Sequence, residues 1–222
     1  MAVIHQTTLS PSKLALLADW LPGQPWYIGR APDLVRAGGF RLDDPLGEVG
    51  IEFMAVTDRS GDQAWTYHVP MTYRGNAIEG GGGGLIGTAE HGVLGRRWIY
   101  DGATDPVLAA QLVALIQGEV QAQAQTVSDT PDTTVACTPV TAVLLSVAGP
   151  PVASAEGKDT EILVPVRTAD GGAGELAVRI SRMLAPSADP GPSGDGRGSV
   201  SATWRVADGT RAHGTFATAW LR

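Results

Sequence analysis

The sequence predicts an α+β protein made mostly of antiparallel β-sheet, with two amphipathic helices in its first half and a β-rich second half. Three observations indicate this class. Apolar residues alternate with a period of two at 49–55 and 65–73, two short segments carry helical stripes, and five strand-like runs follow residue 139. We divide the chain into residues 1–120, a linker or surface crossing at 121–139, and a β-rich region at 140–222 that can pack into the same domain.

The first helix is expected after the strand-like run "MAVIHQTT". Ser10-Pro11 is typical of an N-cap followed by proline at the first helical position, and Pro22-Gly23 should end the helix. One apolar stripe is formed by Leu14, Leu17 and Leu21. The stripe predicts a helix that faces the core.

The second helix is expected after Asp105-Pro106, which again combines an N-cap residue with proline, and Gly118 should terminate it. Its stripe consists of Leu108, Leu112, Leu115 and Ile116. This helix should also bury one face.

Between the helices, residues 49–55 alternate as a half-buried strand that ends at the turn "DRSGD". The next run places Trp65, Tyr67, Val69, Met71 and Tyr73 on one face, which predicts a long antiparallel hairpin. Pro70 cannot donate to a sheet hydrogen bond, so we expect this strand to lie at an edge or to carry a bulge.

The second half begins after a polar stretch rich in Thr, Asp and Pro at 121–139. Its runs are "VTAVLLSVAG", "TEILVPVRT", "GELAVRISRML", "SVSATWRVA" and "GTFATAWL". "ADGGAG" should join the second run to the third, and "ADGT" the fourth to the fifth, as hairpin turns. The loop "APSADPGPSGDGRG" between the third and fourth should be mobile.

Composition excludes several classes of function. A net charge of −7, with a pI near 5.0 and 16 thinly spread basic residues, argues against a nucleic-acid groove or an anionic membrane surface. The first residues show no signal-peptide pattern, and no segment approaches the ~18 apolar residues of a membrane span. We therefore expect a cytoplasmic protein. The single cysteine, Cys137, excludes an intramolecular disulfide and a multi-cysteine zinc site.

The stretch "EGGGGGLIG" spells G-x-G-x-x-G through Gly82, Gly84 and Gly87. A dinucleotide turn needs a parallel strand before it and a helix after it, whereas the flanking segments here are strand-like and the upstream strands are expected to be antiparallel. Five consecutive glycines are also more typical of a loose hairpin tip than of a fixed phosphate cradle. The motif is therefore not expected to bind a nucleotide.

Other sequence motifs of nucleotide binding, catalysis and metal binding are incomplete or absent. "GPPVASAEGKDT" has Asp159 where a Walker loop requires Ser or Thr, and no G-x-S-x-G elbow occurs. The four histidines stand singly, with no second ligand at metal-binding spacing. We expect no catalytic residues, no metal and no cofactor.

One dense cluster remains, and it yields the candidate binding residues. They are Tyr73, Arg74, Glu90, His91, Arg97, Trp98, Tyr100 and Asp101. A carboxylate, an imidazole and a flanking aromatic ring can act on a sugar or stack on one. In the purely structural interpretation Trp98 and Tyr100 face the core, Arg97 and Asp101 are solvated or paired, and Asp105 is only a helix cap. Both interpretations stay open at this stage.

The same part of the chain resembles the N-terminal cap region of actinobacterial maltokinases and related glucosamine kinases. The resemblance runs over about residues 1–119 and is carried by "MAVIHQTTLSPSKLALLADWLPGQPWY", "GGFRLDDPLGEVGIEFMAVTD", "YHVPMTYRG" and, most specifically, "LIGTAEHGVLGRRWIYDGATDPV". In those kinases the cap is a non-catalytic β-rich module resting on the nucleotide-binding lobe. The resemblance implies that residues 1–120 form such a cap-like region.

The chain departs from those kinases where their chemistry resides. A His-Gly-Asp loop is required, but His91-Gly92 is followed by Val93 and His213-Gly214 by Thr215. We therefore expect a non-catalytic binding or regulatory module associated with sugar phosphorylation, or with trehalose, maltose or glycogen and other glucan metabolism. Its partner would be a sugar kinase or another enzyme of that pathway. The alternatives are a carbohydrate-binding protein or hydrolase built on Glu90, His91, Trp98 and Asp101, and an orphaned kinase fragment with neither ligand nor partner.

Overall fold

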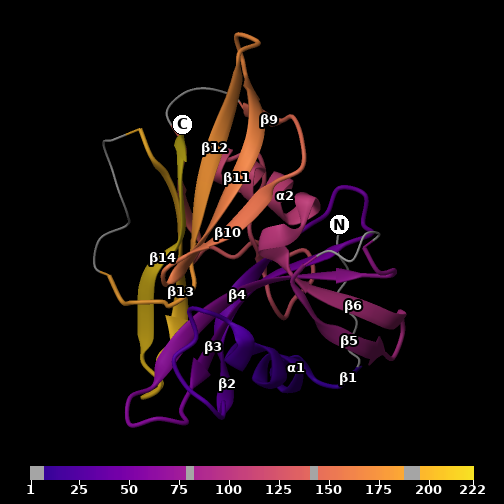
Figure 1. Ribbon diagram of the computed structural model, residues 1–222, viewed down its shortest axis with the longest axis vertical. Helices are drawn as coiled ribbons and strands as arrows, with labels where there is room; N and C mark the ends of the chain where they lie inside the picture. The colour runs from indigo at the N-terminus through magenta and orange to yellow at the C-terminus, as the bar shows by residue number, and fades with distance from the viewer. Residues whose placement is uncertain (1–7, 79–82, 141–144, 188–195) are drawn as a thin grey trace.

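A computed structural model of the chain describes residues 8–78, 83–140, 145–187 and 196–222 (Figure 1). The elements of the first half are β1 (Leu9–Ser10), α1 (Lys13–Trp20), η1 (Leu21–Gly23), β2 (Leu34–Leu42), β3 (Gly50–Asp58), β4 (Trp65–Arg74), β5 (Leu85–His91), β6 (Gly95–Asp101), η2 (Gly102–Thr104) and α2 (Pro106–Gln117). Those that follow are β7 (Gln123–Ala124), β8 (Ala136–Thr138), β9 (Leu145–Val147), β10 (Val152–Glu156), β11 (Asp159–Thr168), β12 (Ala173–Ser181), β13 (Gly198–Arg205) and β14 (Arg211–Leu221). The prediction of a mostly antiparallel sheet with two helices in the first half is confirmed, although the helices are short and sheet dominates.

The helices begin and end for local reasons. Asp105 caps α2 through its carboxylate, proline follows it, and Gly118 closes the helix in the left-handed conformation (φ 78°), all as predicted. The predicted stripe of α2 is buried, but Ala109, Gln111 and Val113 are buried as well, so α2 is enclosed on more than one face. The start predicted for α1 is wrong. Ser12 is its N-cap, because the Ser12 hydroxyl accepts the Ala15 N–H, and helix begins at Lys13.

The β3–β4 hairpin is confirmed, with register from Gly50 opposite Tyr73 to Asp58 opposite Trp65. The half-buried strand predicted at 49–55 is wrong, because β3 is buried on both faces. Met54 and Val56 lie in one apolar cluster with α1, while Phe53 lies in a second cluster with α2 and the second half. The tertiary arrangement, not the local period, decides this burial.

Pro70 lies inside the sheet, not at an edge or a bulge, so that prediction is also wrong. β4 has β3 on one side, and on the other side it changes partner at this position. Residues 71–74 pair with β6, whereas the His68 N–H donates to the Arg182 carbonyl and the Leu184 N–H donates to the Thr66 carbonyl. The missing N–H of Pro70 thus falls between two partners, where it breaks no regular ladder.

These two hydrogen bonds close part of the sheet on itself. The path β4-β3-β2-β13-β14-β12 returns to β4 through residues 182–184, with Tyr67 opposite Met183. Five rings from these strands pack against one another in the enclosed space, with centroids 4.6–6.0 Å apart: Phe40, Phe53, His68, Trp204 and Phe216. The apolar cluster around them contains residues of both halves of the chain.

The remaining strands extend from this closed part in two directions (Figure 1). On one side β6, β5 and β1 follow β4, with α1 packed nearby, and on the other β11, β10 and β9 follow β12. The predicted turns "ADGGAG" and "ADGT" join β11 to β12 and β13 to β14 as expected. The segment 121–139 carries β7 and β8, which pair with β2 and β13.

Four predicted features lie partly or wholly outside the described residues. The run 1–8 is described only at its last residue, and the glycine stretch only from Gly83. Of the run at 140–149, residues 141–144 are not described, and of the loop at 185–198, residues 188–195 are not described.

Candidate functional site

The end of the β5–β6 hairpin holds Glu90 and His91. The Arg96 Nε donates to Glu90 Oε1 over 2.9 Å, and both side chains are about 60% exposed. The His91 Nδ1 accepts the backbone N–H groups of Val93 and Leu94 at 3.3 and 3.1 Å. These contacts stabilise the hairpin turn itself.

Arg97 and Trp98 follow on β6, and both are partly exposed. The Arg97 Nη2 donates to the Leu94 carbonyl at 2.9 Å. Trp98 lies opposite Thr88 on β5 and Arg74 on β4. Neither side chain is fully buried, so both contribute to the surface of this hairpin.

Tyr73 belongs to a partly buried polar cluster centred on the buried Glu52. Its hydroxyl donates to Glu52 Oε2 at 2.5 Å, and the same oxygen receives the Lys13 ammonium at 2.6 Å. Burial and the Glu52 carboxylate raise the pKa of Tyr73 well above its usual value. Burial opposes ionisation of Glu52, but Lys13, Tyr73 and Arg36 together hold the pKa of Glu52 below its usual value. The ionised Glu52 carboxylate therefore links Lys13 of α1 to Tyr73 of the sheet.

Arg74 forms a two-pronged ion pair with Asp105, with Nε and Nη2 each 2.7 Å from a carboxylate oxygen. The Thr72 hydroxyl donates to the same carboxylate at 2.8 Å, and the Val107 N–H donates at 2.9 Å. Burial raises the pKa of Asp105, but these hydrogen bonds outweigh it and lower the pKa below its usual value. Asp105 is therefore a structural anion that fixes α2 to β4.

Tyr100 and Asp101 end β6 in buried positions. The Ile78 N–H donates to the Tyr100 hydroxyl at 3.0 Å. Asp101 Oδ2 accepts Nη2 of the buried Arg182 at 2.5 Å, and Asp101 Oδ1 accepts the Ala103 N–H. Asp101 thus connects the first half of the chain to the second.

The strand register separates the eight candidate residues. Glu90, Trp98 and Tyr100 share one face with Arg74, while His91, Arg97 and Asp101 share the opposite face with Tyr73. The structure therefore does not bring them together in one site. Among the described residues, no group of three or more His, Cys, Asp or Glu side chains is arranged to hold a metal ion.

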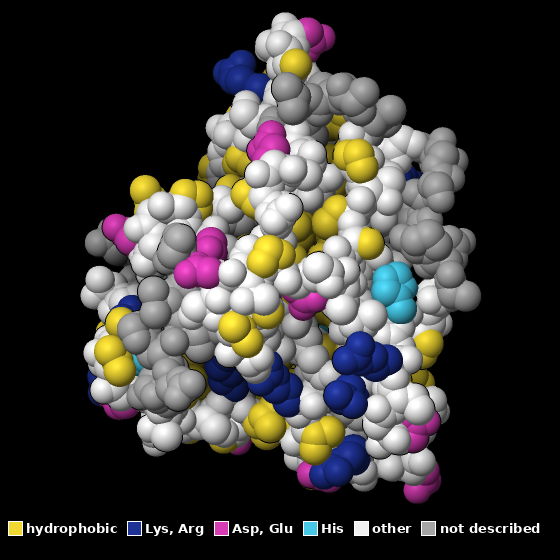
Figure 2. Space-filling model, turned by 180° about the vertical axis from the view of Figure 1, so that it is seen from behind, with side chains coloured by type: hydrophobic (Ala, Val, Ile, Leu, Met, Phe, Trp, Pro, Cys, Tyr) yellow, Lys and Arg dark blue, Asp and Glu magenta, His cyan; other side chains and the backbone are white. Residues whose placement is uncertain are grey.

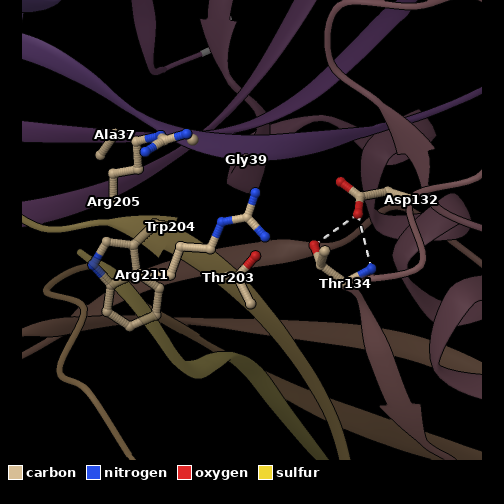
Figure 3. Close-up of a pocket in the computed structure, with 9 residues that line it drawn as sticks. Ala37, Gly39, Asp132, Thr134, Thr203, Trp204, Arg205 and Arg211 are labelled. Carbon is tan, nitrogen blue, oxygen red and sulfur yellow. Dashed lines mark hydrogen bonds between the residues drawn. The ribbon is translucent and has the colours of Figure 1, made fainter. Parts of the chain in front are cut away.

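A hollow of about 210 Å³ lies elsewhere, where β2 and β13 diverge (Figure 3). The two strands share one residue pair, Gly38 opposite Trp204, before β7 pairs with β2 and β8 pairs with β13. The segment between β7 and β8 supplies the third wall with Asp132 and Thr134. Arg205 and Arg211 also line the hollow.

The two arginines are direct cross-strand partners at the end of the β13–β14 hairpin. In Figure 3 the Arg211 guanidinium points towards Thr203 and the Asp132–Thr134 wall, and Arg205 lies on the side of Ala37. Figure 2 shows basic side chains gathered on the lower part of the molecule's back face, the region of β2, β13 and β14. The sequence interpretation did not single out this pair. The turn "ADGT" was the available signal, since Arg205 and Arg211 flank residues 206–210, which contain it.

Like charges directly opposite each other on a hairpin destabilise it. The substitution Arg205→Glu is therefore expected to raise the free energy of unfolding by about 0.2–1 kcal/mol at low salt, and the gain should shrink as ionic strength rises. Urea denaturation at two salt concentrations measures both effects. Arg167→Glu is the control, because exposed Arg167 lies opposite Ala173 and should show no gain. A loss of stability in Arg205→Glu would show that the pair is not repulsive.

A second hollow of about 340 Å³ lies at the C-terminal end of α2, where Leu115, Val135 and Cys137 contribute to its lining. Neither hollow is lined by any of the eight candidate residues. No helix in the described part of the chain is both long and apolar enough to cross a membrane.

Comparison with known families and proteins gives one result. Residues 20–105 match the maltokinase N-terminal cap domain. The match begins in α1, covers β2 to β6 and ends at the N-cap of α2. It confirms the cap-like resemblance for this segment. A comparison of the chain with curated proteins found no match.

Proposed function

We propose that this chain, whose residues 20–105 match the maltokinase N-terminal cap domain, is a non-catalytic module that binds or regulates an enzyme of sugar phosphorylation or of trehalose, maltose or glucan metabolism. The match is the observation that carries the proposal. A cap domain in that family accompanies a kinase domain, so a sugar kinase is the favoured partner.

The state of the polar groups in the cap-like segment supports a non-catalytic role. Glu90 is paired with Arg96, Asp105 with Arg74 and Asp101 with Arg182. A general acid or base needs a titratable group within hydrogen-bonding reach of a substrate. Here the carboxylates are used in ion pairs and caps, and two of the three are buried.

The β5–β6 hairpin supplies a surface suited to a protein partner. Leu85, Val93 and Leu94 are exposed by 47%, 61% and 47%, and partly exposed Trp98 lies on the same hairpin. Apolar and aromatic side chains flanked by arginine are typical of the centre of a protein interface. We assign the partner's docking surface to this hairpin.

The test is capture of the tagged protein's partner, followed by binding measured with purified components. We expect recovery of an enzyme that phosphorylates a sugar or acts on a glucan, identified by mass spectrometry and by sugar-dependent consumption of ATP. Replacing Val93 and Leu94 together by serine should weaken its binding at least about tenfold, because a buried aliphatic side chain contributes about 1.5–3 kcal/mol.

Val152→Ser is the matched control, since Val152 is 65% exposed on β10, away from the hairpin, and its loss should leave binding unchanged. Equal binding by the hairpin variant and the control would remove the hairpin from the interface. Recovery of no such enzyme at stoichiometric level would count against the function itself.

The alternative, a carbohydrate-binding protein or hydrolase that uses Glu90, His91, Trp98 and Asp101, gains no support from the geometry. Glu90 and Trp98 lie on the opposite face of the sheet from His91 and Asp101. The hollows described above also lie away from these residues.

A further inference from the structure

We propose that the hollow between β2 and β13 binds a small phosphate ester that carries a free hydroxyl group. Arg205 and Arg211 would hold the phosphate, and Asp132 would accept the hydroxyl. This inference rests on the hollow alone and is independent of the partner proposed above.

The charge arrangement is the first argument. Arg205 and Arg211 lie directly opposite each other in a chain with a net charge of −7. Within the described part of the chain, neither forms an ion pair with a carboxylate. A bound anion would neutralise the repulsion between them.

The donors available are the second argument. A guanidinium presents five N–H groups in a planar fork that matches phosphate oxygens, and Arg205 uses one of them on the Gly209 carbonyl at 3.4 Å. The Thr203 hydroxyl stands beside Arg211 (Figure 3), whereas the Thr134 hydroxyl on the facing wall already donates to Asp132 Oδ1. Together the two guanidinium groups and the Thr203 hydroxyl can donate to a tetrahedral anion, which has more acceptor oxygens than a carboxylate.

The size of the hollow limits the ligand. About 210 Å³ lies below the roughly 300–1,000 Å³ of pockets for drug-sized ligands. Gly38 permits the close approach of β2 to β13, because a Cβ atom there would lie 3.3 Å from the Trp204 Cα and φ is +152°. A monosaccharide phosphate or a smaller ester can lie largely within this volume, whereas a nucleotide would extend beyond it.

Asp132 is the reason why the ligand should also carry a free hydroxyl group. Its Oδ1 accepts the Thr134 N–H at 2.9 Å and the Thr134 hydroxyl at 2.7 Å. No described residue donates to Oδ2, which leaves one acceptor on the wall opposite the arginines (Figure 3). This carboxylate repels a bare anion but accepts a hydroxyl, so the ester should bind more tightly than sulfate, a tetrahedral anion that carries no hydroxyl at neutral pH.

The experiment is calorimetric titration of the whole chain at neutral pH and constant ionic strength with glucose 1-phosphate, sulfate, and glucose. We expect saturable binding of the ester, weaker binding of sulfate and none of glucose. Arg205→Gln and Arg211→Gln should each weaken the ester at least about tenfold, since a hydrogen bond to a charged group contributes about 1.5–3 kcal/mol. Asp132→Asn should remove the preference for the ester over sulfate.

Arg167→Gln is the matched control for the loss of one exposed arginine, and thermal unfolding without ligand checks that each variant is folded. No binding of the ester at about 10 mM would overturn the proposal. So would an equal loss in Arg167→Gln, because the anion would then be bound by net charge alone. Equal affinity for ester and sulfate would overturn the role assigned to Asp132.

Discussion

Replacing Asp101 by alanine is expected to lower the free energy of unfolding by about 3–5 kcal/mol, because it leaves the charge of Arg182 buried without its partner. The Arg182 side chain is 1% exposed, its Nη2 lies 2.5 Å from Asp101 Oδ2, and its Nε donates to Thr160 Oγ1 at 2.8 Å. The guanidinium also lies 5.0 Å from the centre of the Trp26 ring. Urea denaturation followed by tryptophan fluorescence measures the loss.

Two further variants separate the charge from the cap. Asp101→Asn keeps an acceptor for the Ala103 N–H but removes the charge, so it should lose most of the same stability. Combining Asp101→Asn with Arg182→Met should recover part of the loss, because no unpaired charge then stays buried. The control is Glu90→Ala, which breaks an exposed ion pair and should cost less than about 1 kcal/mol. If Asp101→Ala costs no more than Glu90→Ala, the buried pair does not hold the two halves together.

The elements that could be predicted from the sequence are those set by local chemistry. Asp105, Pro106 and Gly118 define α2 through a cap, a fixed φ and a left-handed residue, and each signal acts within one helical turn. The turn at Asp208-Gly209 fixes the β13–β14 hairpin in the same way, with Gly209 at φ +85°.

The features that could not be predicted depend on contacts between distant segments. Nothing near Pro70 indicates that β4 changes partner there, because one partner follows 30 residues later and the other more than 100 residues later. The burial of β3 on both faces has the same origin, since α1 covers one face and the second half covers the other. A period of two shows where side chains point and not what covers them.

The candidate site could not be predicted for the same reason, because a sequence pattern does not show how the strands pair. The polar residues of 90–101 are close in sequence, but alternation along β6 sends them to two faces. Arg205 and Arg211 could have been paired from the turn between them. Their proximity to Asp132 could not have been predicted. It depends on the divergence of β2 and β13 and on the segment between β7 and β8 that lies between these two strands.

His68 should make the protein sensitive to mild acid. Its ring is fully buried among Phe53 and Phe216, its Nδ1 lies 3.1 Å from the Ser181 carbonyl, and its Nε2 has no partner among the described residues. Burial, and then the positive charge of Arg182, lower the pKa of His68 to about 3. In the unfolded chain the same ring titrates near its ordinary value of about 6.5.

The sign of the pH dependence follows from these two values. Between pH 6.5 and about 3 the unfolded state binds a proton that the folded state does not, so the contribution is fully present above pH 6.5 and is lost as the pH falls. Between pH 7.5 and 5 the free energy of unfolding should drop by about 2 kcal/mol on account of His68, in a range above the ordinary pKa values of carboxylates. Denaturation curves at intervals of half a pH unit measure this drop.

The substitution His68→Asn tests the assignment, because its amide can still donate to the Ser181 carbonyl while carrying no titrating group. It should be less stable than the original protein at pH 7.5, since a buried ring is lost from the cluster with Phe53 and Phe216. The difference between the two proteins should then narrow by about 2 kcal/mol at pH 5. If the free energies of unfolding of the two proteins fall in parallel with pH, a group other than His68 binds the proton. If they converge, the closed core of the sheet is the acid-sensitive part of the fold.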